Sequence, residues 1–293
     1  MTAGARFLVN PGARRGADAL ERVNRLRTLA GRAGAGFVVS RGAGDLAEQA
    51  RRTAEDGVER LLVAGGDGSM HHAIQGLAGT SCALGVIPMG SGNDLAAVLG
   101  APREPEAAVQ AALAGPIRRM DLIRMGETFS ASYIGIGFDS EVTRVANGVK
   151  RLRGPLIYPY AVFRTLAGFR PPFLKIVHDE GTFEGRVMFV TLANIDRFGG
   201  GMRIAPMASF DDGVLDLVIV QETSKLTLLS VFPKVYGGKH VGHPAVGFVR
   251  TRRVEITADR DFEVYGGGEL MRTLAAGETL AAEVVPAGLR VVG

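Results

Sequence analysis

Two glycine-rich turns, each carrying a carboxylate, are the stretches of this sequence best suited to chemistry. The first is Gly65-Gly66-Asp67-Gly68-Ser69 and the second is Gly90-Ser91-Gly92-Asn93-Asp94. Glycines let a backbone come close to an anionic group, and a helix that begins there aims free N–H donors at that group. A carboxylate in such a turn repels phosphate unless a divalent cation lies between the two. The two turns therefore predict a phosphate-binding site that also holds a cation.

Each turn lies between a predicted strand and a predicted helix. Apolar residues 61–64 and 84–88 precede the turns, and apolar residues return at helical spacing over 72–77 and 95–99. A strand, a glycine turn and a helix, repeated twice, form the layout of a nucleotide site at the carboxyl edge of a parallel sheet. Further strands and helices alternate before the first turn, so residues 1–115 are expected to form an α/β domain.

The character of the sequence changes after residue 115. Over residues 116–286, short segments rich in β-forming residues follow one another with turns at close intervals. That pattern predicts a mostly antiparallel β domain. The chain of 293 residues is long enough for each domain to bury a core of its own.

Charge and composition exclude several classes of protein. A net charge of +4 is too small to indicate nucleic-acid binding, although it suits ATP or an anionic membrane surface. No apolar run approaches the ~20 residues that cross a bilayer, and the N-terminal segment lacks the apolar region of a signal peptide. The single cysteine, Cys82, excludes an internal disulfide. We expect a cytoplasmic protein, with peripheral binding at the inner membrane face left open.

The two turns, GGDGS followed by GSGND, closely resemble the catalytic-domain signature of the diacylglycerol kinase and sphingosine kinase superfamily, in its bacterial lipid kinase branch. This resemblance implies a Rossmann-like ATP domain related to that of NAD kinase, followed by a β-sandwich domain that receives the lipid. It also implies that a closing strand at residues 287–293 returns to the first domain. Ser69 and Ser91 stand where the family usually has threonine, and both keep the hydroxyl group.

The nucleotide-binding residues follow from the two turns and from the resemblance. An Asn-Pro turn at Asn10 matches a family position that lines the nucleotide, although Asn-Pro is also a common turn dipeptide. Arg14 and Arg15, just beyond that turn, are candidates for contact with phosphate. The full predicted set is Asn10, Gly65, Gly66, Gly68, Ser69, Gly90, Ser91, Gly92 and Asn93.

Three aspartates are the candidates for a catalytic Mg²⁺. Asp67 and Asp94 come from the turns themselves, and carboxylates are hard oxygen ligands that leave room for water and ATP oxygens. The resemblance adds Asp121, which in the bacterial family joins the other two in a network around the cation. The alternatives are a turn-capping role for Asp67 and Asp94, and a salt bridge at the surface or the domain boundary for Asp121.

A second metal site is implied by residues 199–216. They resemble a long family motif of glycines, Ala-Pro-x-Ala and Asp-Asp-Gly-x-Leu-Asp, where bacterial members hold a structural Mg²⁺. Carried over, the ligands are the side chain of Asp212 and the main-chain carbonyls of Ser209 and Val214. From the residues alone, Asp-Asp-Gly is more typical of a plain turn between strands.

The expected general base is Glu269. The family usually carries Asp-Gly-Glu beside the acceptor hydroxyl, whereas this chain has Gly267-Gly268-Glu269, so Gly267 replaces the aspartate. A general base must lie within hydrogen-bond reach of the proton that it removes, and Glu269 is the remaining acid of that motif. Asp67 is the alternative base. The missing aspartate leaves open a weak or specialised kinase.

Taken together, the residues and the resemblance predict a phosphotransferase that uses ATP and Mg²⁺ to phosphorylate a lipid hydroxyl, with diacylglycerol as the favoured acceptor. The alternatives are an NAD kinase-like enzyme, which the second turn argues against, and a nucleotide-binding protein with weak or no turnover. The lipid acceptor is expected at a membrane surface, no nucleic-acid partner is expected, and a homodimer paired through β edges is one candidate assembly. Basic clusters at 150–153 and 234–239 suit either anionic lipid or plain solvent.

Overall fold

The computed structural model describes residues 4–13, 19–149 and 157–293. Arg14 and Arg15, the candidates for phosphate contact, and the basic cluster at 150–153 lie outside the described residues. The chain divides into two compact units, of which the first comprises Met1–Leu122 with Val285–Gly293 and the second comprises Ile123–Val284. The division falls inside the continuous strand β5 (Ile117–Met125), a few residues after the boundary expected at 115.

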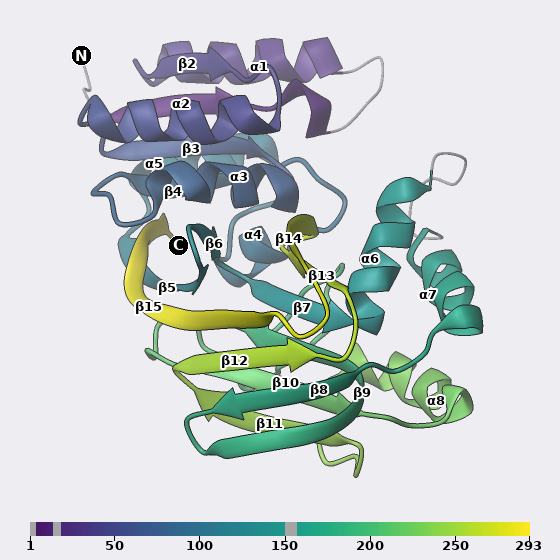
Figure 1. Ribbon diagram of the computed structural model, residues 1–293. Coiled ribbons are helices and arrows are strands. Elements are labelled where there is room, and N and C mark those ends of the chain that lie inside the picture. The colour runs from purple at the N-terminus through teal and green to yellow at the C-terminus, as the bar shows by residue number, and fades with distance from the viewer. Residues whose placement is uncertain (1–3, 14–18, 150–156) are drawn as a thin grey trace. The chain divides into compact units, whose positions relative to one another are not determined.

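The first unit is built on a parallel sheet with strand order β2-β1-β3-β4-β15 (Figure 1). Its first four strands are β1 (Ala5–Val9), β2 (Gly36–Val39), β3 (Arg60–Gly65) and β4 (Ala83–Pro88). Its helices are the short η1 (Pro11–Ala13), α1 (Ala19–Arg32), α2 (Ala43–Glu55), α3 (Asp67–Leu77), α4 (Asp94–Val98) and α5 (Pro105–Ala114). The central strands β3 and β4 are buried along almost their whole length, as parallel strands covered on both faces must be.

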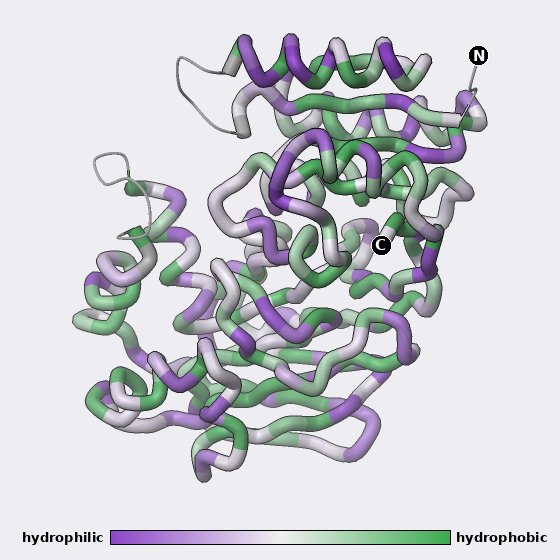
Figure 2. Tube along the Cα trace, turned by 180° about the vertical axis from the view of Figure 1, so that it is seen from behind, coloured by the Kyte–Doolittle hydropathy of each residue, from purple (hydrophilic) through white to green (hydrophobic). Residues whose placement is uncertain are grey.

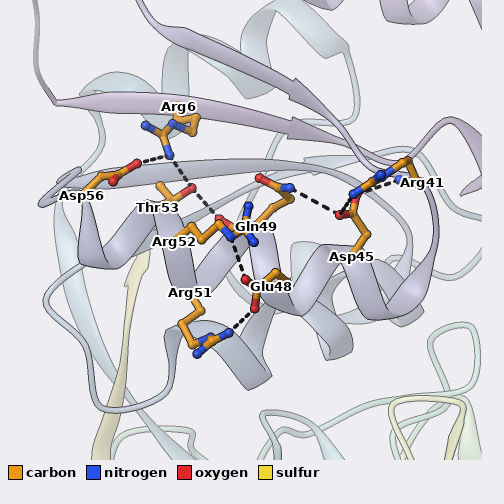
Figure 3. Close-up of polar contacts among 9 residues, drawn as sticks. All are labelled: Arg6, Arg41, Asp45, Glu48, Gln49, Arg51, Arg52, Thr53 and Asp56. Atoms are coloured by element: carbon orange, nitrogen blue, oxygen red, sulfur yellow. Dashed lines mark hydrogen bonds and ion pairs between the residues drawn. The ribbon is translucent and has the colours of Figure 1, made fainter.

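Helices α1 and α2 are amphipathic, and polar side chains hold α2 against the sheet. Figure 2 shows hydrophobic and hydrophilic residues alternating along α1, whose Leu26 and Ala30 enter the core. Arg6 on β1 donates hydrogen bonds to Thr53 Oγ1 at 3.2 Å and to Asp56 Oδ2 at 2.8 Å, at the end of α2 (Figure 3). These contacts fix the C-terminal end of α2 against β1.

The last strand of the chain, β15 (Thr279–Val292), belongs to both units. Its residues Arg290 and Val291 pair in parallel with Ala83 and Leu84 of β4. Earlier in the same strand, residues 279–283 pair antiparallel with β12 (Arg253–Ala258) in the second unit. The closing segment of the chain thus forms part of the first unit's sheet.

The second unit is mostly antiparallel, so the α/β and β-sandwich classes predicted from the sequence are confirmed. Its remaining strands are β6 (Thr128–Ser130), β7 (Tyr133–Gly137), β8 (Phe173–His178), β9 (Gly181–Ala193), β10 (Leu215–Gln221), β11 (Val246–Thr251), β13 (Phe262–Gly266) and β14 (Glu269–Leu274). The long strand β9 links two layers, because its first half pairs with β8 and its second half pairs with β7 and β10. The main core of the unit lies between these layers.

Three helices pack beside the strands of the second unit. They are α6 (Phe138–Gly148), α7 (Ile157–Gly168) and α8 (Lys225–Val235), and Figure 1 shows them gathered at one end of those strands. A second apolar cluster lies beneath them, with Phe138, Leu166 and Phe169 among its members. Among the described residues, no helix has both the length and the apolar character to cross a membrane.

Candidate functional site

The predicted site residues fall into two groups, one in each unit. In the first unit, Asp67 follows the end of β3 and begins α3. Its Oδ2 accepts the N–H of Asn93 at 2.7 Å, and its Oδ1 accepts the N–H of Leu95 at 3.4 Å. The carboxylate of the first turn therefore binds the backbone of the second turn, which is the turn-capping role that the sequence had left open. Carboxylate oxygens have lone pairs beyond these two bonds, so a role toward a cation stays a prediction.

The two glycine turns lie directly against each other. A Cβ built on Gly90 would lie 2.6 Å from the Cα of Gly66, so neither position accommodates a larger residue without movement. Asn93 closes the second turn in a left-handed conformation, with φ of 58°. Its Oδ1 accepts the Gly90 N–H and its Nδ2 donates to the Gly90 carbonyl, both at 2.8 Å. The glycines are thus needed for backbone contact between the turns as well as for any approach to a ligand.

We expect Gly90→Ala to lower the free energy of unfolding by about 1–3 kcal/mol, because the new methyl group must push the turns apart. The matched control is Gly44→Ala, since a Cβ at Gly44 meets no atom within 4 Å and the residue lies in a helix. That control is expected to be neutral or slightly stabilising. Urea denaturation of both variants measures the difference, and equal stability of the two would show that the turns can separate freely.

The remaining nucleotide-site residues gather at the same edge of the sheet. Asn10 follows β1, and its Nδ2 donates to Ser69 Oγ at 2.8 Å while its Oδ1 accepts the Gly12 N–H at 3.0 Å. The backbone N–H of Asn10 bonds the carbonyl of Ala64, and that of Met89 bonds the carbonyl of Gly65. The structure therefore brings all nine predicted nucleotide-site residues to the carboxyl ends of β1, β3 and β4.

A buried histidine on α3 is electrically neutral at physiological pH. His71 is 8% exposed, and burial lowers its pKa to about 4, with a smaller contribution from His72. A neutral imidazole gives no positive charge to a phosphate group. His71 therefore supplies no positive charge beside the glycine turns at physiological pH.

The three aspartates proposed for the catalytic cation are not assembled into one cluster. Asp67 and Asp94 flank Gly92, since a Cβ there would lie 2.7 Å from Asp67 Oδ2 and 3.6 Å from Asp94 Oδ2. Asp121 instead accepts the Ala287 N–H at 2.7 Å and fixes the closing strand, where Ala287 has a φ of 53°. Within the described ranges, no three acidic, histidine or cysteine side chains lie close enough to hold a metal ion. Of the three, only Asp67 and Asp94 lie together at the turns.

In the second unit, Glu269 lies at the start of β14, just after a tight hairpin turn. Gly266 pairs with Glu269, and the two residues between them, Gly267 and Gly268, have φ of 60° and 87°. Positive φ at both central positions defines a turn that accepts Asp-Gly as well as Gly-Gly. Glycine in place of the family aspartate thus keeps the backbone path. Asn147 on α6 donates to the Gly268 carbonyl at 3.0 Å and holds the turn.

The loop predicted to hold a structural metal is closed by protein groups. Asp212 Oδ1 accepts the Val214 N–H at 3.2 Å, and the guanidinium of Arg250 forms an ion pair with Oδ2. Ser209 Oγ donates to Asp211 Oδ1 at 2.8 Å. Arg250 already supplies positive charge to Asp212, so a metal bound there would share this carboxylate with the guanidinium. The assignment of Ser209, Asp212 and Val214 as ligands stays a prediction.

The second unit also contains an apolar cavity. It has a volume of about 90 Å³ and is lined from β7 and β9 and from all three helices, including Val142, Val162 and Phe232. Asp139 is one of its few polar members. Although this residue is half-buried as a whole, its Oδ2 lies where a Cβ on Gly135 would clash, and burial raises the pKa of its carboxyl to about 7. This residue was not identified from the sequence; the Gly-x-Gly-Phe-Asp spacing, with a glycine four residues before the aspartate, is the signal that could have identified it.

Family patterns match both parts of the chain. The Diacylglycerol kinase catalytic domain matches residues 4–125, and the YegS C-terminal NAD kinase beta sandwich-like domain matches residues 132–293. Among curated relatives, a diacylglycerol kinase of Mycobacterium tuberculosis is 35% identical over 245 residues, covering 80% of this chain and 77% of the relative. A diacylglycerol kinase of Bacillus subtilis is 28% identical over 231 residues, covering 78% and 76%.

Solved structures agree on the fold. A diacylglycerol kinase of Bacillus anthracis superposes with a TM-score of 0.76 at 20% identity, covering 99% of this chain and 96% of that one. Yeast NADH kinase superposes with a TM-score of 0.50 at 10% identity, covering 99% and 83%. These likenesses concern the fold, whereas the sequence matches extend over both units. The chain therefore belongs to the diacylglycerol kinase family, whose members are phosphotransferases that act on an alcohol group.

Proposed function

We propose that this protein is an ATP- and Mg²⁺-dependent lipid kinase that transfers a γ-phosphoryl group to the hydroxyl of diacylglycerol. The observation that carries the proposal is the pair of glycine turns joined through Asp67, in a chain of this family. Phosphoryl transfer depends on positioning and on charge stabilisation more than on covalent chemistry. A pre-assembled phosphate cradle is the part of the machinery that such a reaction needs first.

In this proposal the first turn and the start of α3 bind the phosphates of ATP. The first N–H groups of a helix have no partner within the helix and face an anion placed at its N-terminus. Gly68 and Ser69 lie in that first turn, and Asn10 holds the Ser69 hydroxyl in place. The donor set of Asp67 and Asp94, two carboxylates flanking Gly92, suits Mg²⁺, which when bound neutralises phosphate charge.

The second unit supplies the acceptor groups. The apolar lining of the cavity suits the hydrocarbon part of a lipid, although acyl chains require it to widen beyond about 90 Å³. Helix α8 has fewer buried residues than α6, since Val235 is its one buried residue, so α8 is the wall that we propose moves. Helix α6 connects this cavity with the hairpin of Glu269, since Phe138 and Val142 line the cavity and Asn147 bonds the hairpin. Glu269 takes the proton of the attacking hydroxyl at its carboxylate. In this proposal Asp139, which lines the apolar cavity, orients the acceptor.

The test is ATP consumption with Mg²⁺ across diacylglycerol, sphingosine, ceramide, phosphatidylglycerol and NAD, with parent protein and Asp67→Asn. Turnover of diacylglycerol, with kcat lowered at least about a hundredfold in the variant, supports the proposal. The matched control is Asp179→Asn, because Asp179 likewise accepts a backbone N–H, that of Arg252 at 2.6 Å, but in the turn between β8 and β9 of the second unit. Turnover of NAD alone would instead favour an NAD kinase-like enzyme. ATP binding without any turnover would favour a nucleotide-binding protein with weak or no turnover.

A further inference from the structure

A buried imidazole in the wall of the apolar cavity has an unpaired nitrogen. His240 lies in the segment between α8 and β11, is 4% exposed, and lines the cavity beside Val235 and Val246. Within the described residues, its Nδ1 atom has no hydrogen-bond partner. Buried polar atoms in folded proteins are nearly always paired, so an unpaired one in a cavity wall needs a functional explanation.

The second ring nitrogen of His240 determines which proton the imidazole carries. Nε2 lies 2.9 Å from the carbonyl oxygen of Ile204. A carbonyl oxygen only accepts hydrogen bonds, so Nε2 bears the proton and donates it. Burial lowers the pKa of His240, and the bond to the Ile204 carbonyl has a smaller opposite effect, so the ring is neutral at physiological pH. Nδ1 is therefore unprotonated and can act only as an acceptor.

The protein offers a donor to a neighbouring imidazole and leaves that of His240 to the cavity. His243, three residues further along, accepts the N–H of Ala245 at its own Nδ1, at 3.2 Å. His240 instead packs against an aromatic ring, since its ring centroid lies 6.0 Å from that of Phe248. The two histidines of this segment thus differ in the same atom, which is paired in His243 and available to a ligand in His240.

The lining of the cavity limits the kind of ligand that can pair with His240. Apart from Tyr133, Asp139, Thr143 and His240, the side chains that line it are apolar. A pure hydrocarbon fits such a lining, but it excludes water from Nδ1 and leaves this acceptor unpaired, which weakens binding. A hydrocarbon that carries a hydroxyl group fits the lining and also donates a hydrogen bond to Nδ1.

We propose that His240 is a specificity-determining residue, which selects lipids that bring a hydrogen-bond donor into the apolar cavity. The inference rests on the proposed function and narrows its acceptor to a diacylglycerol with a further hydroxyl group on an acyl chain. The ester carbonyls of a plain diacylglycerol are acceptors and cannot pair with Nδ1. The hydroxyl that receives the phosphoryl group is a separate one, because it must lie within reach of the base.

Nitrogen NMR of the full chain, isotopically labelled at its histidines, tests this pairing without ATP or catalysis. The probes are butanol and methyl propyl ether, which are isomers of a size suited to a cavity of about 90 Å³, and only butanol has a donor. Butanol is expected to shift the Nδ1 resonance of His240 upfield, as donation to this nitrogen does, and the ether is expected to leave it in place. Butanol is also expected to bind about tenfold more tightly than the ether.

His240→Phe keeps an aromatic ring and removes both nitrogens. The variant is expected to bind the ether as the parent does and to bind butanol no more tightly than the ether. The matched control is His178→Phe, because His178 on β8 also has a buried Nδ1 without a partner among the described residues but does not line this cavity. This control is expected to keep the preference for butanol. If His240→Phe does not fold, the resonance of the parent protein decides by itself.

Kinetics with lipid acceptors extends the test to the proposed reaction. For the parent, kcat/KM is expected to be about tenfold higher for a diacylglycerol with a hydroxyacyl chain than for plain diacylglycerol of the same length. The difference is expected to disappear in His240→Phe and to persist in His178→Phe. The amide N–H of ceramide supplies the same donor chemistry, so turnover of ceramide above both diacylglycerols would assign the donor to an amide instead of a hydroxyl group.

The inference and the proposed function fail separately in these experiments. The role of His240 is overturned if butanol leaves its Nδ1 resonance unchanged, if Nδ1 already resonates as a hydrogen-bonded nitrogen without any probe, or if the parent turns over plain and hydroxylated lipids equally. The expected butanol shift without turnover of any lipid would contradict the proposed function alone, since the shift is measured without catalysis.

Discussion

Glu269→Gln is expected to lower kcat for diacylglycerol phosphorylation by about 10²–10⁴-fold while leaving the Kd for ATP unchanged. The amide cannot accept the proton of the acceptor hydroxyl, and general base catalysis has this magnitude in other enzymes. The substitution preserves the hairpin, because the turn is made by Gly267 and Gly268 and held by Asn147. Steady-state kinetics and equilibrium ATP binding measure the two quantities.

A matched variant for this prediction is Glu278→Gln, which changes the same group type on an exposed residue paired with Arg272. It is expected to leave kcat within about twofold of the parent value, as surface changes away from a site usually do. If Glu269→Gln also leaves kcat unchanged, the base lies elsewhere, and Asp67 is the next candidate. Because Gly267 replaces the aspartate of the family motif, Glu269 is the sole acid of that motif in this chain. No second acid of the motif can replace it as the base in the Glu269→Gln variant.

Asp139→Asn is expected to remove a large pH dependence from the free energy of unfolding. Burial raises the pKa of this carboxyl from 3.8 to about 7 in the native chain. Between those pH values the unfolded chain has released the proton and the native chain still holds it, so the free energy of unfolding falls as pH rises through this window. The fall amounts to about 4 kcal/mol and is complete above the native pKa.

Urea denaturation of parent and variant at a pH near 4 and a pH near 8 measures this difference. The asparagine keeps the neutral shape, so the variant is expected to gain stability over the parent as pH rises. The contribution of His71 to the pH dependence is common to both proteins and cancels in the comparison. Asp45→Asn is a matched control, because the Arg41 backbone hydrogen bond lowers the pKa of Asp45 below its ordinary 3.8, so its contribution changes only below that pH and its profile between pH 4 and pH 8 is expected to follow the parent. Identical pH profiles for parent and Asp139→Asn would mean that the native carboxyl is ionised.

Local sequence signals predicted the parts of the site that are local in the chain. The alternation of strands and helices, the two glycine turns and the position of Asn10 all depend on residues a few places apart, and the structure gathers them at one sheet edge. The contact of Asp67 with Asn93 joins two such turns that are 26 residues apart. A single βαβ unit spans that distance, so the proximity of the two turns could be predicted from the sequence.

The parts that the sequence did not reveal depend on contacts between distant residues. Asp139 accepts a hydrogen bond from Thr191, 52 residues away, and its burial depends on the packing of β7 and β9. Asp121 bonds Ala287, 166 residues away, which no local pattern indicates. The ion pair of Asp212 with Arg250 likewise requires β10 and β11 to be adjacent. Each of these carboxylates could bind a cation or a hydrogen-bond donor, and only the fold shows which partner it has.

The crossing of β15 between the units has a consequence for the order of folding. The second unit is one continuous segment, Ile123–Val284, so it can form its contacts as soon as it leaves the ribosome. The first unit lacks the strand beside β4 until Val285–Gly293 has been synthesised, and loop closure over so many residues is slow. Until then the edge of β4 offers unpaired N–H and C=O groups to other chains. We therefore expect that expression of the first unit by itself requires the closing strand, Val285–Gly293, to be joined to it by a short linker.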